Sequence, residues 1–252
     1  MSALPGEDHA SGGKRQALML SNSSALFVEQ WQDPVLAKHI VGLIGKPHPV
    51  ICHIGAANGD SPAKTDKFYA LAMRVGFEPR HLNLFALEDD KPDTFFDGVD
   101  GIYIDGGSTR NLRDLLKELY ADRALRDAYN SGQVIIGASA GANIMFEWGM
   151  TDSVRTRIEP TRGLGLLPGS ISVHSDVRAD RVESFARYLA SADARFPAYA
   201  LDDGTCLHFV NEALAQCVTS NPNAQVRQHK RDDPSSTLLV VQTLPAPTGE
   251  AA

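Results

Sequence analysis

The most informative segment of the chain reads Val134-Ile135-Ile136-Gly137-Ala138-Ser139-Ala140-Gly141-Ala142-Asn143-Ile144-Met145. It predicts a buried strand that turns through G-x-S-x-G directly into a helix, which is the sequence context of a nucleophile elbow. In such a turn the central serine adopts a strained backbone conformation, and the small flanking residues let strand and helix approach closely. A tight turn that serves packing alone is the alternative for the same glycines. The context favours catalysis, so Ser139 is the candidate nucleophile.

Outside this segment, short apolar runs alternate with longer amphipathic stretches. The alternation is typical of parallel strands that are buried on both faces and joined by helices. We therefore predict a single α/β domain built on a mostly parallel sheet flanked by helices, with an antiparallel edge or a small β extension after residue 198. The expected strands are 17–20, 50–54, 82–87, 101–104, 133–136, 170–173, 198–201, 206–210 and 238–242, and the expected helices are 34–43, 63–75, 110–120, 140–146 and 178–189.

The amino-acid composition limits which cellular compartment and which binding partners are expected. The 252 residues include 24 Lys+Arg and 31 Asp+Glu, a net charge of −7, so neither nucleic acid nor an anionic membrane surface is expected as a partner. No apolar run approaches the roughly 20 residues of a membrane helix, and the N-terminus lacks the apolar core of a signal peptide. Three widely spaced cysteines predict free thiols, so we expect a cytoplasmic protein.

The ends of the chain differ from its middle. Residues 1–16 are rich in Gly, Ser and charged side chains, and 245–252 have a similar character, so we expect a disordered extension and a disordered tail around a folded domain at 17–244. The segment 221–236 contains Pro, Asn and charged residues. It suits either a surface loop or a subunit contact, which leaves a homodimer open.

A serine hydroxyl needs a base, usually a histidine that a third group holds. His174 follows an expected strand directly and precedes a loop into a helix, at the sheet edge where reactive groups gather in open α/β folds. His53 and His208 lie within expected strands, where a core histidine is the better interpretation. The preferred carboxylate to hold the base is Asp152, just past the elbow helix. The alternatives are Glu147 in the helix body, Asp176, Asp202 and Asp203.

A second glycine-rich turn joins a strand to a helix at Asp105-Gly106-Gly107-Ser108-Thr109. Adjacent glycines expose backbone amides, so this loop predicts an oxyanion donor or a phosphate site at the helix start. Nucleotide binding is the weaker option, because both the P-loop Lys and the G-x-G-x-x-G spacing are missing. The turn at 55–60 suits a pocket wall or a plain turn. No metal-ligand spacing occurs, and we expect neither a metal nor another cofactor.

Four motifs occur in order along the chain: Leu18-Met19-Leu20-Ser21-Asn22-Ser23, Gly106-Gly107-Ser108-Thr109, Gly137-Ala138-Ser139-Ala140-Gly141-Ala142-Asn143, and Gly165-Leu166-Leu167-Pro168 leading to His174. With them the chain resembles the dipeptidase E and cyanophycinase family of serine peptidases from about residue 18 to residue 209. The first and third motifs look more like dipeptidase E, which removes an N-terminal aspartate from short peptides. Ser108 departs from the usual Gly-Gly-Asn-Thr. The sequence Ser-Val-His-Ser around His174 differs from the Asp-Gln-His-Phe type of cyanophycinases, which argues against cyanophycin as the substrate.

This resemblance implies a fold similar to class I glutamine amidotransferases, of the flavodoxin-like kind, and a Ser-His-Asp/Glu triad. By the resemblance Ser139 is the nucleophile, His174 the base and Asp152 the acid that orients it. The amide of Ala140 and that of Gly107, with Gly106 as the alternative to Gly107, would form the oxyanion hole. The implied reaction is attack of the serine on a peptide carbonyl, followed by hydrolysis of the acyl-enzyme.

The resemblance also implies how a small peptide substrate is bound. Arg178 matches the position of an arginine that receives the substrate aspartate, and a guanidinium can bind a carboxylate through two hydrogen bonds. A solvated helix face is the alternative for Arg178. Gly106 is expected to line the substrate site. The predicted function is a serine exopeptidase for Asp-X dipeptides, and its alternatives are an esterase or amidase with the same triad and a non-catalytic amidotransferase-like binding domain.

Overall fold

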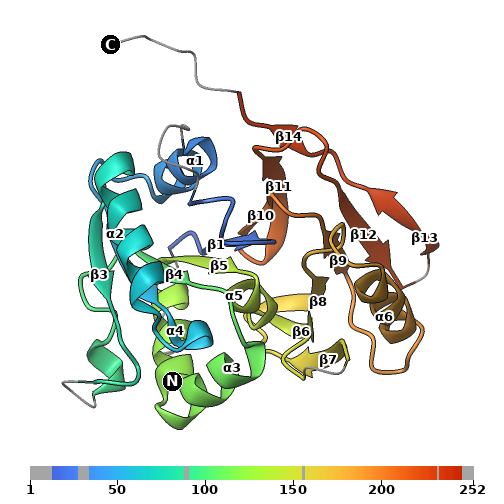
Figure 1. Cartoon of the computed structure of the whole chain (residues 1–252), viewed down its shortest axis with the longest axis horizontal. Coiled ribbons are helices and arrows are strands. Elements are labelled where there is room, and N and C mark those ends of the chain that lie inside the picture. Colours follow the sequence, from blue (N-terminus) through green and yellow to red (C-terminus); the bar gives the residue numbers. More distant parts are fainter. Residues whose placement is uncertain (1–12, 28–33, 88–90, 155–156, 232, 246–252) are drawn as a thin grey trace, which may run out of the picture.

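The main sheet of the computed structural model has eight strands among the described residues, which are 13–27, 34–87, 91–154, 157–231 and 233–245. Its strand order is β14-β11-β10-β1-β5-β4-β2-β3 (Figure 1). The parallel strands are β1 (Gln16–Leu20), β2 (Val50–Ile54), β3 (Glu78–His81), β4 (Gly101–Ile104) and β5 (Val134–Ala138). On the other side of β1 lie β10 (Thr205–Val210) and β11 (Ala213–Thr219), which are antiparallel, and the short β14 (Gln242–Thr243). The predicted parallel sheet and its antiparallel edge are therefore confirmed.

Helices cover both faces of the main sheet (Figure 1). One face carries α1 (Val35–Ile44) and α2 (Pro62–Val75), and the other carries α3 (Thr109–Glu118) and α4 (Ala121–Asn130). Side chains along β1 alternate between the two cores: Leu18 and Leu20 pack on the α1–α2 side, whereas Ala17 and Met19 pack on the α3–α4 side. Because both faces are buried, this strand is a continuous apolar run in the sequence.

A second sheet, which the sequence analysis did not predict, follows the elbow. Its strand order is β13-β12-β9-β8-β6-β7. The strands are β6 (Phe146–Thr151), β7 (Glu159–Arg162), β8 (Leu167–Ser172), β9 (Ala198–Leu201), β12 (Val226–Lys230) and β13 (Asp233–Leu238). β6, β8 and β9 run parallel to one another. The helix α6 (Ala179–Leu189) packs on this sheet through Phe185 and Tyr188.

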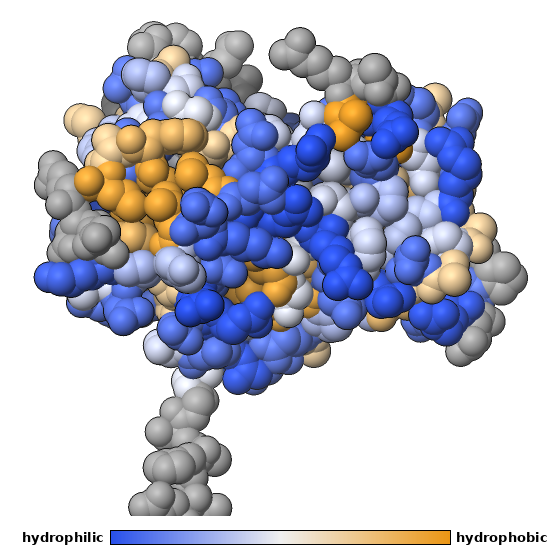
Figure 2. All heavy atoms as spheres, turned by 90° about the horizontal axis from the view of Figure 1, so that it is seen from below, coloured by the Kyte–Doolittle hydropathy of each residue, from blue (hydrophilic) through white to orange (hydrophobic). Residues whose placement is uncertain are grey.

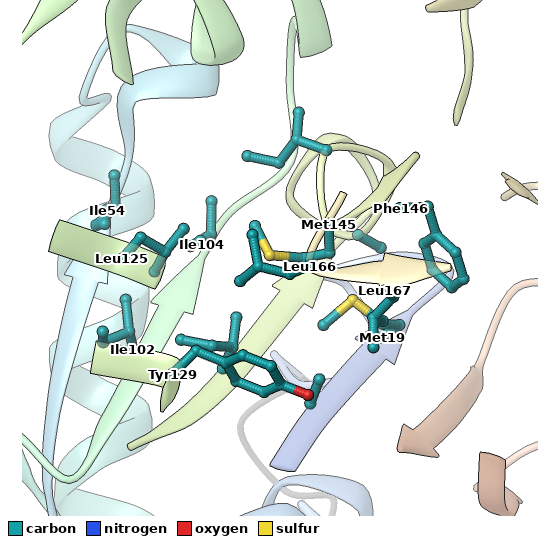
Figure 3. Packing of buried hydrophobic residues seen from close by; sticks show 14 of the residues in the cluster. Met19, Ile54, Ile102, Ile104, Leu125, Tyr129, Met145, Phe146, Leu166 and Leu167 are labelled. Atoms are coloured by element: carbon teal, nitrogen blue, oxygen red, sulfur yellow. The ribbon is translucent and has the colours of Figure 1, made fainter. Parts of the chain in front are cut away.

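One apolar cluster joins the two sheets. The ring of Phe146 in β6 lies 6.0 Å from that of Tyr199 in β9 and 5.7 Å from that of Phe209 in β10, measured between centroids. Figure 3 shows Met19 of the main sheet beside Leu167 of the second sheet in the same cluster. Since the two sheets bury their side chains in a common core, they form one domain.

One predicted strand is displaced. The sequence predicts a strand over 82–87, whereas β3 lies at Glu78–His81 and a turn follows it. β3 is the edge strand of the main sheet and is half exposed, so it carries no apolar run. Pro79 within it is tolerated because an edge strand has one unpaired side.

The helix predicted over 140–146 is shorter than expected. α5 covers only Ala140–Asn143, and the chain enters β6 at Phe146. The side-chain amide of Asn143 donates to the carbonyl oxygen of Met150 at 2.9 Å, and the amide of Leu164 donates to that of Ile144 at 2.6 Å. These bonds turn the chain back into the second sheet, where Phe146 is fully buried.

Two further expectations concern the C-terminal third and the chain ends. Much of 221–236 belongs to the antiparallel pair β12–β13 and not to a loop. The expected disorder at the ends falls mainly on 1–12 and 246–252, which lie outside the described residues. β1 begins at Gln16, one residue before the expected start of the domain.

Hydrophilic side chains cover much of the face seen in Figure 2; the largest apolar area lies at its left, and smaller ones lie near the lower centre and at the upper right. Charged residues belong at such a surface because their burial without a partner is costly. Within the described ranges, no helix combines the length and the apolar character that a membrane crossing requires.

Two histidines predicted for the core are buried in the main sheet. His53 stacks on Phe68 and Tyr103, with ring centroids 5.0 and 5.6 Å apart. His208 Nε2 lies 3.0 Å from Gln16 Oε1. Burial lowers the pKa of both imidazoles from 6.5 to about 4, because removal from water disfavours the charged form. Both side chains are therefore neutral in the folded protein near neutral pH.

We expect the free energy of unfolding to fall as the pH is lowered from about 6.5 to about 4. In this window the unfolded chain binds protons at His53 and His208 that the folded chain does not bind, so protonation favours unfolding; above the window the contribution is complete. Urea titrations followed by tryptophan fluorescence across this range measure the effect. A His208→Gln variant should show a shallower dependence, and an unchanged dependence would exclude His208 as a source.

Candidate active site

Ser139 lies at the turn between β5 and α5. Its backbone angles, φ 52° and ψ −106°, are strained for a residue with a side chain, as an elbow requires. Its amide donates to the carbonyl oxygen of Leu20 at 3.0 Å, which ties the turn to the end of β1. A Cβ atom on Gly141 would lie 2.1 Å from the carbonyl oxygen of Ile104, so only glycine fits there. The serine is thereby held at the carboxyl edge of the main sheet.

His174 meets Ser139 from the second sheet. It follows β8, and its Nε2 lies 2.9 Å from Ser139 Oγ. Its φ of 59° is in the left-handed region, and its amide donates to Ser21 Oγ at 2.9 Å. The structure thus brings together the two residues that the sequence proposes as nucleophile and base.

Asp203 completes a chain of hydrogen bonds. Its Oδ1 lies 2.6 Å from His174 Nδ1. Because a carboxylate accepts and does not donate, Nδ1 carries the imidazole proton, and Nε2 is left to accept the hydroxyl proton of Ser139. This order of groups can activate a serine and stabilise the imidazolium that forms when the proton moves.

The prediction that Asp152 orients His174 is wrong. Asp152 Oδ2 accepts hydrogen bonds from Arg178 Nη1 at 3.2 Å and from Arg181 Nη2 at 3.1 Å. Arg181 is buried, and the loss of water lowers the pKa of its guanidinium. A buried charge requires a partner, and Asp152 supplies it.

The remaining candidate carboxylates have other contacts. Glu147 accepts from the amide of Gly169 at 2.7 Å, and Asp202 accepts from a backbone amide at 3.0 Å while burial raises its pKa. Asp176 accepts from the amide of Asp203 at 2.9 Å and so fixes the loop that carries the acid. Among the described residues, no group of three or more His, Cys, Asp or Glu side chains is arranged to hold a metal ion.

Strand order explains why Asp203 reaches the histidine. β8 and β9 are neighbours and run parallel, so their carboxyl ends lie side by side. His174 follows the first of these strands, and Asp203 follows the second. A sequence signal exists, because Asp202-Asp203-Gly204 comes directly after the apolar run 198–201. The sequence pattern does not reveal which strands are neighbours, because this depends on residues far apart in the chain.

Ser21, which belongs to the first of the four sequence motifs, links His174 to Asp203. Its hydroxyl is fully buried, accepts from the amide of His174, and lies 3.0 Å from Asp203 Oδ1 and 3.3 Å from the carbonyl oxygen of Leu201. The next residue, Asn22, accepts from the amide of Gly204 at 3.0 Å. The end of β1 therefore positions both the histidine and the aspartate.

The loop at Gly106 packs directly against Ser139. A Cβ atom on Gly106 would lie 3.0 Å from Ser139 Cβ. The amide of Gly106 already donates to Asp105 Oδ1 at 2.6 Å. Gly106 therefore lines the site but does not offer its amide to a ligand.

Two backbone amides belong to the segments that meet at Ser139. Those of Gly107 and Ala140 donate no hydrogen bond within the part of the chain that the structure describes. Ala140 is the first residue of α5, where a helix leaves its N–H groups unpaired. Two free donors on either side of a nucleophile are the arrangement that can bind an oxyanion.

Arg178 lies at the start of α6 and is bound by carboxylates. Its Nη2 is 2.6 Å from Asp180 Oδ2, and its Nη1 contacts Asp152. Ser153, next to Asp152, accepts a hydrogen bond from the amide of Arg110 at the start of α3. The loops that follow β4, β6 and β8 are thus joined by side chains, and Arg178 belongs to this group.

Comparison with known proteins finds relatives over most of the chain. Residues 18–217 match the profile of Peptidase family S51. The uncharacterized peptidase YgaJ of Bacillus subtilis (strain 168) is 37% identical over 190 residues, which are 75% of this chain and 82% of the relative.

Two crystal structures are similar in fold. A peptidase from an acI-B1 Actinobacterium has a TM-score of 0.67 and 19% identity, covering 91% of this chain and 96% of that one. A putative Peptidase E protein from Listeria monocytogenes EGD-e has a TM-score of 0.60 and 14% identity, covering 80% and 97%. The expected peptidase E fold, similar to class I glutamine amidotransferases, is confirmed.

The roles of Asp203 and Asp152 can be distinguished by the rate at which a fluorophosphonate labels Ser139. Asp203→Asn keeps the side-chain shape but favours the wrong imidazole tautomer, so we expect the labelling rate to fall by about 10³-fold or more. Asp152→Asn is the matched control and should change the rate by less than about fivefold. Mass spectrometry of the labelled peptide measures both rates. The reverse order of effects would return Asp152 to the triad.

A second test concerns Ser21. Ser21→Ala removes the acceptor of the His174 amide and one contact to Asp203. We expect the labelling rate at Ser139 to fall by about tenfold, the cost of one hydrogen bond of ordinary strength. Ser131→Ala, at the exposed end of α4, is the control. A rate equal to that of this control would show that Ser21 does not hold the base.

Proposed function

The chain belongs to peptidase family S51, and we propose that it is a serine exopeptidase that hydrolyses short peptides with an N-terminal aspartate. The observation that supports the serine mechanism best is the hydrogen-bonded chain from Ser139 Oγ through His174 to Asp203 Oδ1. In this proposal Asp203 takes the place in the triad that the sequence analysis gave to Asp152.

Catalysis begins with attack of Ser139 Oγ on the carbonyl carbon of the scissile peptide bond. His174 Nε2 takes the hydroxyl proton as the C–O bond forms, and Asp203 stabilises the imidazolium. The carbonyl electrons move to the oxygen, which binds the amides of Gly107 and Ala140. Collapse breaks the C–N bond, and His174 gives its proton to the leaving amine. Water then attacks the acyl-enzyme by the same route and restores Ser139.

Arg178 supports the preference for aspartate. Its guanidinium lies half exposed at the start of α6, four residues after His174, and its contact with Asp152 is a single hydrogen bond of 3.2 Å. A substrate carboxylate can replace this one contact, while Asp180 keeps the guanidinium in place. Arg181 adds positive charge on the same helix.

The proposal is tested with the dipeptides Asp-Leu, Glu-Leu and Ala-Leu. We expect the wild type to cleave Asp-Leu best and Ser139→Ala to lose turnover of all three. Arg178→Ala should lower kcat/KM for Asp-Leu by about 10- to 100-fold, the value of a charged hydrogen bond, and leave Ala-Leu within about threefold. Arg187→Ala on the same helix is the control.

Other results would redirect the assignment. Equal losses on Asp-Leu and Ala-Leu in Arg178→Ala would reject this arginine as the aspartate receptor. Turnover of small esters at matched concentration, without turnover of any dipeptide, would favour an esterase with the same triad. No labelling of Ser139 and no turnover would reject the serine peptidase.

A further inference from the structure

We propose that Lys64 and Asn58 are positioning residues of the oxyanion hole, which act by fixing the orientation of the peptide bond between Gly106 and Gly107. The inference rests on the proposed function, because it assigns a role to residues behind the same site. Lys64 lies in the first turn of α2, and Asn58 ends the turn that follows β2.

Side chains bind both the carbonyl oxygen and the amide of Gly106. The carbonyl oxygen of Gly106 accepts from Asn58 Nδ2 at 3.1 Å and from Lys64 Nζ at 3.2 Å. The amide of Gly106 donates to Asp105 Oδ1 at 2.6 Å. Two neighbouring glycines would otherwise allow this peptide to rotate at little cost, because neither carries a Cβ atom.

The direction of the Gly106 carbonyl decides whether this peptide offers an amide donor or a carbonyl oxygen to the site at Ser139. In a trans peptide the C=O and the following N–H point in opposite directions. With the Gly106 oxygen turned toward Lys64 and Asn58, the amide of Gly107 points away from them and donates no hydrogen bond within the described residues. If the peptide turned over, a carbonyl oxygen would replace the amide donor and repel the oxyanion.

A buried carboxylate holds the two donors in place. Asp105 is 1% exposed, and its Oδ2 accepts from Asn58 Nδ2 at 3.0 Å and pairs with Lys64 Nζ at 3.2 Å. Tyr103 donates to its Oδ1 at 3.1 Å. The Gly107 backbone is also confined on the other side, since a Cβ atom there would lie 2.1 Å from the carbonyl oxygen of Ala57. The turn at 55–60, which the sequence left open between a pocket wall and a plain turn, therefore supports the oxyanion loop.

Lys64 gives the cleaner test, because Asn58 also accepts from the amide of Ser61 at the start of α2. In Lys64→Met the side chain stays long and unbranched, whereas the terminal donor is lost. We expect kcat on Asp-Leu to fall about tenfold, less than the 10²–10³-fold reported for removal of a direct oxyanion donor. KM should stay within about threefold, and the affinity for a peptide aldehyde, which forms a tetrahedral adduct, should fall by the same factor as kcat.

Three comparisons complete the experiment. Lys64→Arg restores a donor and should recover most of kcat, whereas Lys64→Gln is too short to reach Gly106 and should behave like Lys64→Met. Lys67→Met, which removes the same charge from an exposed position of α2, should match the wild type. The pH profile should be unchanged in all variants, because the triad is untouched, and the midpoint of urea unfolding checks the fold.

The outcomes separate this inference from the function on which it rests. If the wild type is labelled at Ser139 and cleaves Asp-Leu but Lys64→Met and Lys64→Gln behave like Lys67→Met, the inference is rejected and the function stands. A loss confined to KM, or one that Lys64→Arg fails to recover, also rejects it. A wild type with neither labelling nor turnover rejects both.

Discussion

The geometry of the site depends on the hydrogen bonds at the carboxyl end of β1. The carbonyl oxygen of Leu20 holds the amide of Ser139, and the buried hydroxyl of Ser21 holds the amide of His174 and contacts Asp203. Ser139, His174 and Asp203 come from three different loops on two sheets, yet each bonds to one of two consecutive residues. Backbone groups in a buried strand are fixed more firmly than side chains on a surface loop. The relative positions of the triad are therefore set by the strand and not by the loops themselves.

Two buried ions in the structure are each paired with a partner that is partly exposed. Asp105 pairs with Lys64, and Arg181 pairs with Asp152. An ion pair that keeps one partner in contact with water loses less solvation than a fully buried pair. The carboxylate of Asp152, which the sequence analysis preferred as the acid, instead neutralises an arginine. Asp152 therefore balances the charge of Arg181 in α6. The carboxylate beside His174 is that of Asp203, which follows β9.

The local features of the site could be predicted from the sequence, and its non-local pairings could not. The elbow around Ser139 and the strand before His174 both have local signals, a G-x-S-x-G turn and an apolar run with a polar residue after it. Asp203 has the same kind of signal, but its selection over Asp152 requires that β8 and β9 be neighbours. The second sheet escaped prediction because Phe146, at its start, continues a helical pattern from the elbow. The edge strand β3 escaped because a half-exposed strand carries no apolar run.

The division of the triad between two sheets has a consequence for biosynthesis. Ser139 follows β5, which is synthesised early, whereas Asp203 follows β9, which is synthesised much later. The next strand, β10, pairs antiparallel with β1 and is synthesised later still. A nascent chain that ends before residue 203 lacks the carboxylate that contacts His174 Nδ1. The chain of hydrogen bonds from Ser139 to Asp203 is therefore complete only after β9 has been synthesised and lies beside β8.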